Sequence, residues 1–162
     1  MNNQQDLFLA AKTALEERGI DLNELAVLVC NAQKKHNPDI TEEIAMHHII
    51  SVLKKREVQH AVLTGIALDV AAEQKLLPEP LLGIIERDEG LYGVDETLAM
   101  SITGCYGSIA SSNFGYFDIT KPGIIGLFND KKAKPGEVHT YADDLLCAIV
   151  AAACSRYAHR EG

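Results

Sequence analysis

The longest uninterrupted apolar run, LLCAIVAAAC at residues 145–154, constrains the fold more than any other feature. A helix that spans a bilayer needs about 20 apolar residues, and this run has about half that length. We therefore expect a soluble protein. The run belongs to a predicted last helix, about residues 140–159, one face of which carries only small side chains: Cys147, Ala148, Ala151 and Ser155. That face predicts close contact with another helix.

Helical periodicity extends over almost the whole chain, and no convincing alternating strand interrupts it. Asp21 with Glu24 predicts a helix start, and so does Thr41. We expect one compact all-α domain over residues 1–162, with about six to seven helices. The first expected helix ends at Gly19, and the second and third start at Asp21 and Thr41. The remaining helices are expected to cover about residues 56–76, 80–88, 94–111 and 140–159. The segment between the last two is expected to be a loop.

The composition excludes several function classes. The net charge is −8, from 15 basic and 23 acidic residues, and no Lys/Arg-rich run is visible. This disfavours nucleic-acid binding and simple electrostatic docking onto anionic lipid. The N-terminal MNNQQDLFLAAK lacks the pattern of a signal peptide. The four cysteines form no CxxC pair, so we expect reduced core thiols in a cytoplasmic protein.

Two acidic pairs fall on helix faces that should be apolar or small, where carboxylates are uncommon. In VDETLAM, Asp95 shares its face with Leu98, Ala99 and Ile102, and Glu96 follows it. A structural interpretation makes Asp95 the N-cap of that helix, with Glu96 favoured by the helix dipole. The alternative is that the pair is functional.

The second pair, Asp143 and Asp144, opens the last helix in HTYADDLLCAIVAAAC. Thr140 and Asp143 fit a capping box, which would give Asp143 a structural role. Asp144 is harder to explain in this way, because its face continues through the small residues. A carboxylate at such a helix contact needs a cationic partner, either a side chain or a metal.

Between these pairs lies GYFDITKPG at residues 115–123, with Asp118 three residues before Lys121. Pro122 disfavours helical geometry at Lys121, so we expect this lysine to project from an extended loop. Acidic residues gathered from several helices supply the hard oxygen ligands that Mg²⁺ prefers, and a lysine beside them could hold an anionic group. The pattern would suit metal-assisted phosphate hydrolysis.

Three of these segments, VDETLAM, NFGYFDITKPGIIG and HTYADDLLCAIVAA, resemble in order and spacing the successive motifs of the phosphatidylglycerophosphatase A family. The resemblance covers about residues 60–158 and leaves the expected N-terminal helices, about 3–55, without support. Typical members have long apolar membrane helices and an N-terminal PGT-type segment. This chain has neither, so it resembles a soluble branch of the family.

The resemblance implies a Mg²⁺-dependent phosphatase that converts phosphatidylglycerophosphate to phosphatidylglycerol. It implies metal binding by Asp95, Glu96, Asp143 and Asp144. Lys121, Asp118 and Asp144 would be catalytic: Lys121 would offset negative charge in the transition state, and Asp118 would be a further ligand or an orienter of Lys121.

Other interpretations stay open at this point. The chain could act on a soluble phosphomonoester, or be a non-catalytic helical module that binds a cation or a partner. His139 borders the second acidic pair, where it would be either an acid/base group or a residue that begins the helix. Apolar helix faces are compatible with a homodimer, and a lipid substrate would require transient contact with a membrane.

Overall fold

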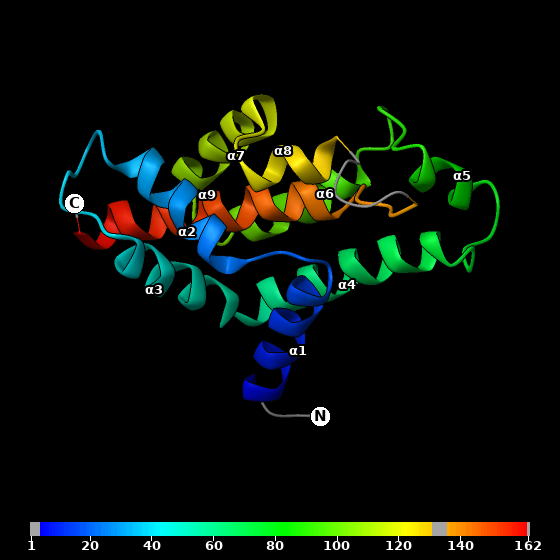
Figure 1. Cartoon of the computed structure of the whole chain (residues 1–162), viewed down its shortest axis with the longest axis horizontal. Coiled ribbons are helices and arrows are strands. Elements are labelled where there is room, and N and C mark those ends of the chain that lie inside the picture. Colours follow the sequence, from blue (N-terminus) through cyan, green and yellow to red (C-terminus); the bar gives the residue numbers. More distant parts are fainter. Residues whose placement is uncertain (1–3, 131–135, 162) are drawn as a thin grey trace.

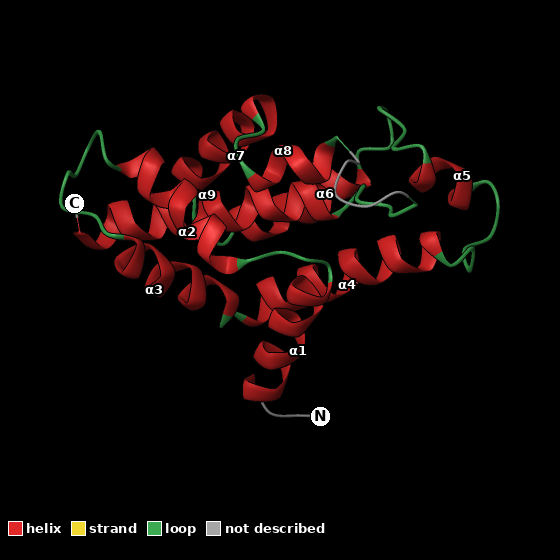
Figure 2. Cartoon of the chain, in the orientation of Figure 1, coloured by secondary structure: helices red, strands yellow, loops and turns green. Residues whose placement is uncertain are grey.

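A computed structural model of the protein describes residues 4–130 and 136–161. The described residues contain helices and loops and no strand, as predicted (Figure 2). They form nine helices, so the expected count of six to seven is wrong. The helices are α1 (Gln4–Glu17), α2 (Leu22–Gln33), α3 (Glu42–Leu53), α4 (Arg56–Glu73), α5 (Leu81–Glu86), α6 (Val94–Thr103), α7 (Ser108–Thr120), α8 (Ile124–Asn129) and α9 (Ala142–Glu161).

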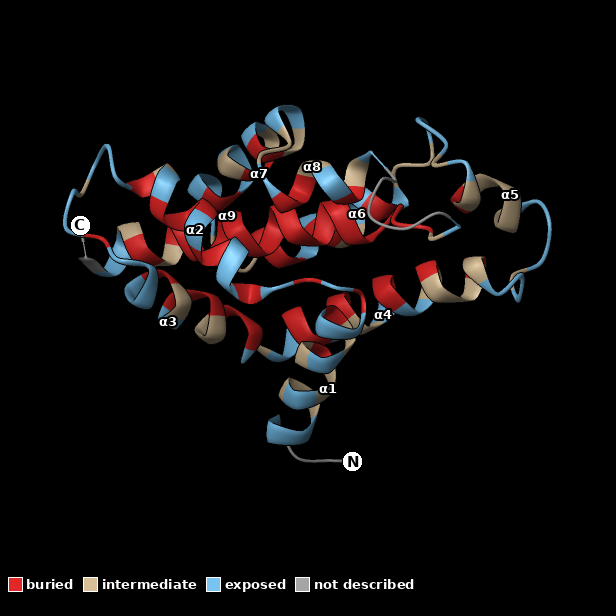
Figure 3. Cartoon of the chain, viewed as in Figure 1, coloured by how far each residue is buried: buried red, intermediate tan, exposed pale blue. Residues whose placement is uncertain are grey.

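Helix α9 is the centre of the fold. It runs through the middle of the other helices, and most of its ribbon is buried (Figures 1 and 3). It packs against α2, α3, α6 and α7, while α1 extends from the body of the molecule and packs mainly against α4. The predicted small face of α9 is fully buried, and Ser155 Oγ donates to the carbonyl of Tyr106 at 3.0 Å. The close contact with another helix that this face predicts is therefore confirmed.

Local capping signals gave correct helix starts. The Asp21 side chain accepts a hydrogen bond from the backbone N–H of Asn23, and Thr41 accepts one from Ile44. No helix of the described residues has the length and apolar character needed to cross a membrane. All four cysteines are free, and Cys30, Cys147 and Cys154 are buried.

The segment expected to be a long loop is largely helical, and this prediction was wrong. The expected helix over 94–111 is divided at Gly107, and a second helix, α7, continues to Thr120. Phe114 and Phe117 of α7 are buried, because α7 packs against α9. The burial of these two aromatic side chains offsets the low helix propensity of Gly115.

Candidate functional site

The site is built around the first turn of α9, and a buried carboxylate from another helix fixes where that turn begins. Asp69 of α4 is fully buried and accepts hydrogen bonds from the backbone N–H of Tyr141 at 3.0 Å and of Ala142 at 2.9 Å. The first N–H groups of a helix have no partner within the helix, so this carboxylate caps α9 across the fold. It thereby fixes the position of the two aspartates that follow.

Sequence reasoning missed Asp69, although a signal was present. Asp69 follows Val62 and Ile66 at helical spacing, and all three are buried on the same face of α4. A lone acid on an apolar stripe needs a partner. Its partners lie more than 70 residues further along the chain, so only the fold identifies them.

Asp143 and Asp144 are both buried, with exposed fractions of 5% and 4%. The expected capping box is wrong, because the Thr140 hydroxyl donates to the carbonyl of Ile85 at 2.6 Å. The Asp143 carboxylate instead accepts a hydrogen bond from Lys121 at 2.9 Å. Asp143 is therefore paired with the ammonium group of Lys121.

Lys121 joins two of the predicted segments. Its Nζ donates to Asp118 Oδ1 at 2.7 Å and to Asp143 Oδ2 at 2.9 Å, and lies 3.9 Å from Asp144 Oδ1. The extended backbone expected for Lys121 is wrong, since the residue ends α7 in the left-handed region, at φ 44°. A Cβ on Gly126 would approach the Lys121 carbonyl to 2.6 Å, so only glycine fits there.

The first acidic pair divides between the interior and the surface. Asp95 is buried on the face of α6 that also buries Ala99 and Ile102, as the periodicity predicts. It is not the N-cap, because Gly93 occupies that position in the left-handed region. Glu96 is exposed. Asp95 acts electrostatically on Asp144, so it belongs to the same buried cluster.

The cluster gathers several carboxyl groups around one ammonium group, that of Lys121. Burial, reinforced by Asp143 and Asp95, raises the pKa of Asp144 to about 9. Burial also raises the pKa of Asp143 to about 6, although Lys121 lowers it. Burial opposes the charge on Lys121, but Asp143 and Asp118 raise its pKa. At neutral pH the Asp144 carboxyl is therefore mainly protonated, and a cation bound there would displace its proton.

The donor chemistry of these residues fits a hard divalent cation, because every candidate ligand is a carboxylate oxygen. Over residues 4–130 and 136–161, no group of three or more His, Cys, Asp or Glu side chains is arranged to hold a metal ion. On the α7 side, the ammonium group of Lys121 lies directly against Asp118 and Asp143, so these carboxylates are not arranged around a metal ion. Asp144, with its raised pKa, is the carboxylate that most needs further positive charge.

His139 precedes the start of α9 at Ala142, and its side chain packs in the interior. The side chain is buried, its ring lies 4.6 Å from that of Phe128, and its Nδ1 is 3.1 Å from Arg18 Nη2. Its Nε2 is 2.8 Å from Glu137. Nε2 lies beside the Glu137 carboxylate but has no hydrogen-bond partner, and no contact joins the ring to Asp143 or Asp144 among the described residues. An acid/base role at the aspartates therefore has no support from the geometry.

Fold and site together define an all-helical protein with a carboxylate-rich site closed around one lysine. The chain belongs to the phosphatidylglycerophosphatase A family, whose family model matches residues 25–159. The predicted resemblance is thus confirmed.

The chain is also similar to individual relatives and solved structures. The uncharacterized protein YutG of Bacillus subtilis (strain 168) is 53% identical over 93% of this chain and 89% of its own length. A solved protein of unknown function from Bacillus stearothermophilus is 52% identical, with a TM-score of 0.91 over 95% of this chain and 99% of that one. The low temperature requirement C protein from Listeria monocytogenes is 48% identical, with a TM-score of 0.93 over 98% and 99%.

Proposed function

We propose that this protein is a Mg²⁺-dependent phosphomonoesterase that acts on phosphatidylglycerophosphate or a closely related phosphomonoester. The observation that carries the proposal is the contact of Lys121 with Asp118 and Asp143, beside the buried Asp144. Membership of the phosphatidylglycerophosphatase A family supplies the reaction class. A lipid substrate would bring the protein from the cytoplasm into transient contact with a membrane surface.

Asp95, Asp143 and Asp144 would hold the metal from the buried side, and the exposed Glu96 from the solvent side. When bound, Mg²⁺ would polarise the phosphoryl oxygens and lower the pKa of a water molecule. The chain contributes part of the preorganisation, because Asp69 fixes the start of α9 and with it the backbone positions of Asp143 and Asp144. Lys121 would have to move from Asp143 for that carboxylate to bind the metal.

Lys121 would bind the phosphoryl group. Phosphoryl transfer spreads negative charge over the oxygens of the transferred group, and a fixed cation stabilises that charge. Asp118 holds the ammonium group of Lys121 through a 2.7 Å hydrogen bond, so it would act as a positioning residue. Asp143 and Asp118 raise the pKa of Lys121, so it is charged at neutral pH.

Phosphate release tests this proposal directly. Purified protein would be treated with EDTA and then supplied with Mg²⁺, with phosphatidylglycerophosphate in one series and glycerol 3-phosphate in the other. We expect release only with Mg²⁺, and the ratio of the two rates identifies the substrate class. Stabilisation by Mg²⁺ without turnover on either substrate would contradict catalysis and favour a cation-binding module.

A further inference from the structure

A second charged site lies at the opposite end of α9 from the aspartates. A pocket of about 530 Å³ opens between the end of α3, the start of α4, the α6–α7 connection and the last turns of α9. Its lining includes four cationic side chains: Lys54, Lys55, Arg156 and Arg160. The chain has a net charge of −8, so a cluster of four cationic side chains contrasts with its acidic composition.

Most of these cations have no carboxylate to balance them. Among the described residues, Lys54, Lys55 and Arg160 form no ion pair, and Arg156 is hydrogen-bonded to His48 at 2.7 Å. Lys55 Nζ lies 5.5 Å from the ring centroid of Tyr106. The exposed Glu57 also acts on Tyr106 electrostatically, as do Arg156 and Arg160, so an acid lies near the same pocket.

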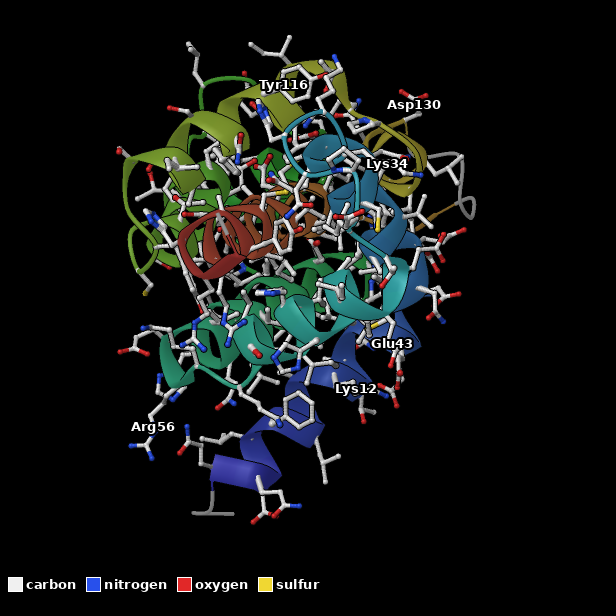
Figure 4. All side chains as sticks on the ribbon, turned by 90° about the vertical axis from the view of Figure 1, so that its left-hand side faces the viewer. Lys12, Lys34, Glu43, Arg56, Tyr116 and Asp130 are labelled. Carbon is white, nitrogen blue, oxygen red and sulfur yellow. The ribbon has the colours of Figure 1, made fainter. Side chains whose placement is uncertain are left out.

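Helix stability explains only part of the cluster. Cations at the end of a helix interact favourably with its dipole, which accounts for Lys54 after α3 and Arg160 in the last turn of α9. Lys55 and Arg56 stand at the start of α4, where the dipole disfavours positive charge. That start has no side-chain cap, although α4 has 18 residues. Arg56 extends outward there (Figure 4).

A bound anion would account for both the cations without carboxylate partners and the start of α4 without a side-chain cap. It would bind the unpaired cations, and the uncapped N–H groups of α4 beside Lys55 favour negative charge. Two lysines and two arginines suit a multiply charged oxyanion better than a single carboxylate, because arginine can bind its oxygens in a bidentate manner. We propose that this pocket binds a phosphate-bearing anion, either a phosphorylated small molecule or the headgroup of an anionic phospholipid.

This site is separate from the aspartate cluster. Asp144 and Arg156 are 12 residues apart on the same helix, which places their backbones ~18 Å apart. The inference therefore does not depend on the proposed phosphatase activity. It adds a cationic contact for phosphate to a protein whose net charge repels it.

Binding measurements with two probes test the inference. Calorimetry would measure the binding of inorganic phosphate to the protein. Sedimentation would measure the binding of the protein to vesicles of phosphatidylglycerol with phosphatidylcholine, and vesicles of phosphatidylcholine alone would be the control. The test variant is Lys55→Gln with Arg160→Gln. The control, Lys34→Gln with Lys35→Gln, makes the same charge change at exposed positions, and Lys34 lies far from Arg56 (Figure 4).

We expect the test variant to weaken binding at least about tenfold, because two charge-assisted hydrogen bonds are lost. The control should bind like the wild type, which attributes the loss to this pocket and not to the change in net charge. Binding of phosphate alone would identify a small ligand, and binding only to anionic vesicles would identify a lipid headgroup. No binding of either probe, or equal binding by the test variant, would overturn the inference. Lys54→Gln with Arg160→Gln repeats the test should the first variant unfold.

Discussion

Replacing Asp69 by alanine removes the only side chain shown to accept hydrogen bonds from the N–H groups of Tyr141 and Ala142. Both groups lie in the interior, where Tyr141 and Ala142 are buried, so water cannot readily replace the lost acceptor. The variant therefore leaves two donors of α9 unsatisfied, next to the proposed catalytic aspartates.

The magnitude follows from the number of donors. A buried polar group left without a partner costs about 1–3 kcal/mol, so two such groups should cost ~3 kcal/mol or more. For a chain of this size, that loss corresponds to a decrease in Tm of roughly 6–12 °C. Asp69→Asn keeps one acceptor oxygen and should lose about half as much.

Thermal unfolding followed by circular dichroism measures the effect, with the exposed Asp39→Ala as the matched control. The order of Tm should be wild type and Asp39→Ala, then Asp69→Asn, then Asp69→Ala. Phosphate release should fall in the same order, because Asp143 and Asp144 follow the capped turn. An Asp69→Ala protein that melts within 2 °C of the wild type would refute the capping argument.

Three further substitutions test other parts of the structure. Lys121→Met should abolish phosphate release while the protein stays folded, and turnover near the wild-type rate would remove Lys121 from the mechanism. Gly65→Ala places a Cβ 2.8 Å from Leu145 Cδ1. We therefore expect the free energy of unfolding, measured by chemical denaturation, to decrease by about 1–3 kcal/mol despite the better helix propensity of alanine. An increase in stability would show that α4 and α9 can separate without cost. Burial, helped by the charge of Arg156, lowers the pKa of His48 to about 4, so the unfolded chain takes up this proton first as the pH falls. The unfolding free energy should therefore decrease as the pH falls from ~6.5 to about 4, and His48→Gln should lack this decrease. Identical pH profiles for the wild type and the variant would contradict this argument.

Features that depend on neighbouring residues were predictable from the sequence. The starts of α2 and α3 follow from Asp21 and Thr41, whose side chains accept hydrogen bonds two or three residues away. The burial of α9 follows from its apolar run and its small face, because such a surface has to be covered by other helices.

Features that depend on distant contacts were not predictable in the same way. Gly115 and Pro122 indicated a loop, but the packing of α7 on α9 makes the segment helical up to Lys121. The contact of Lys121 with Asp143 joins residues 22 positions apart, and the cap by Asp69 joins residues 72 and 73 apart. Only the family motifs suggested that the three acidic segments meet, since periodicity alone gives the faces of helices and not their neighbours.

The central claim is that buried aspartates around Lys121 support metal-dependent phosphate release. The most direct measurement is the rate of phosphate release from phosphatidylglycerophosphate by the wild type and by Asp144→Asn, each with Mg²⁺ and with EDTA. The account predicts release by the wild type with Mg²⁺ alone, and none by the folded variant under either condition. Equal release by the two proteins, or no Mg²⁺-dependent release by the wild type, would contradict it.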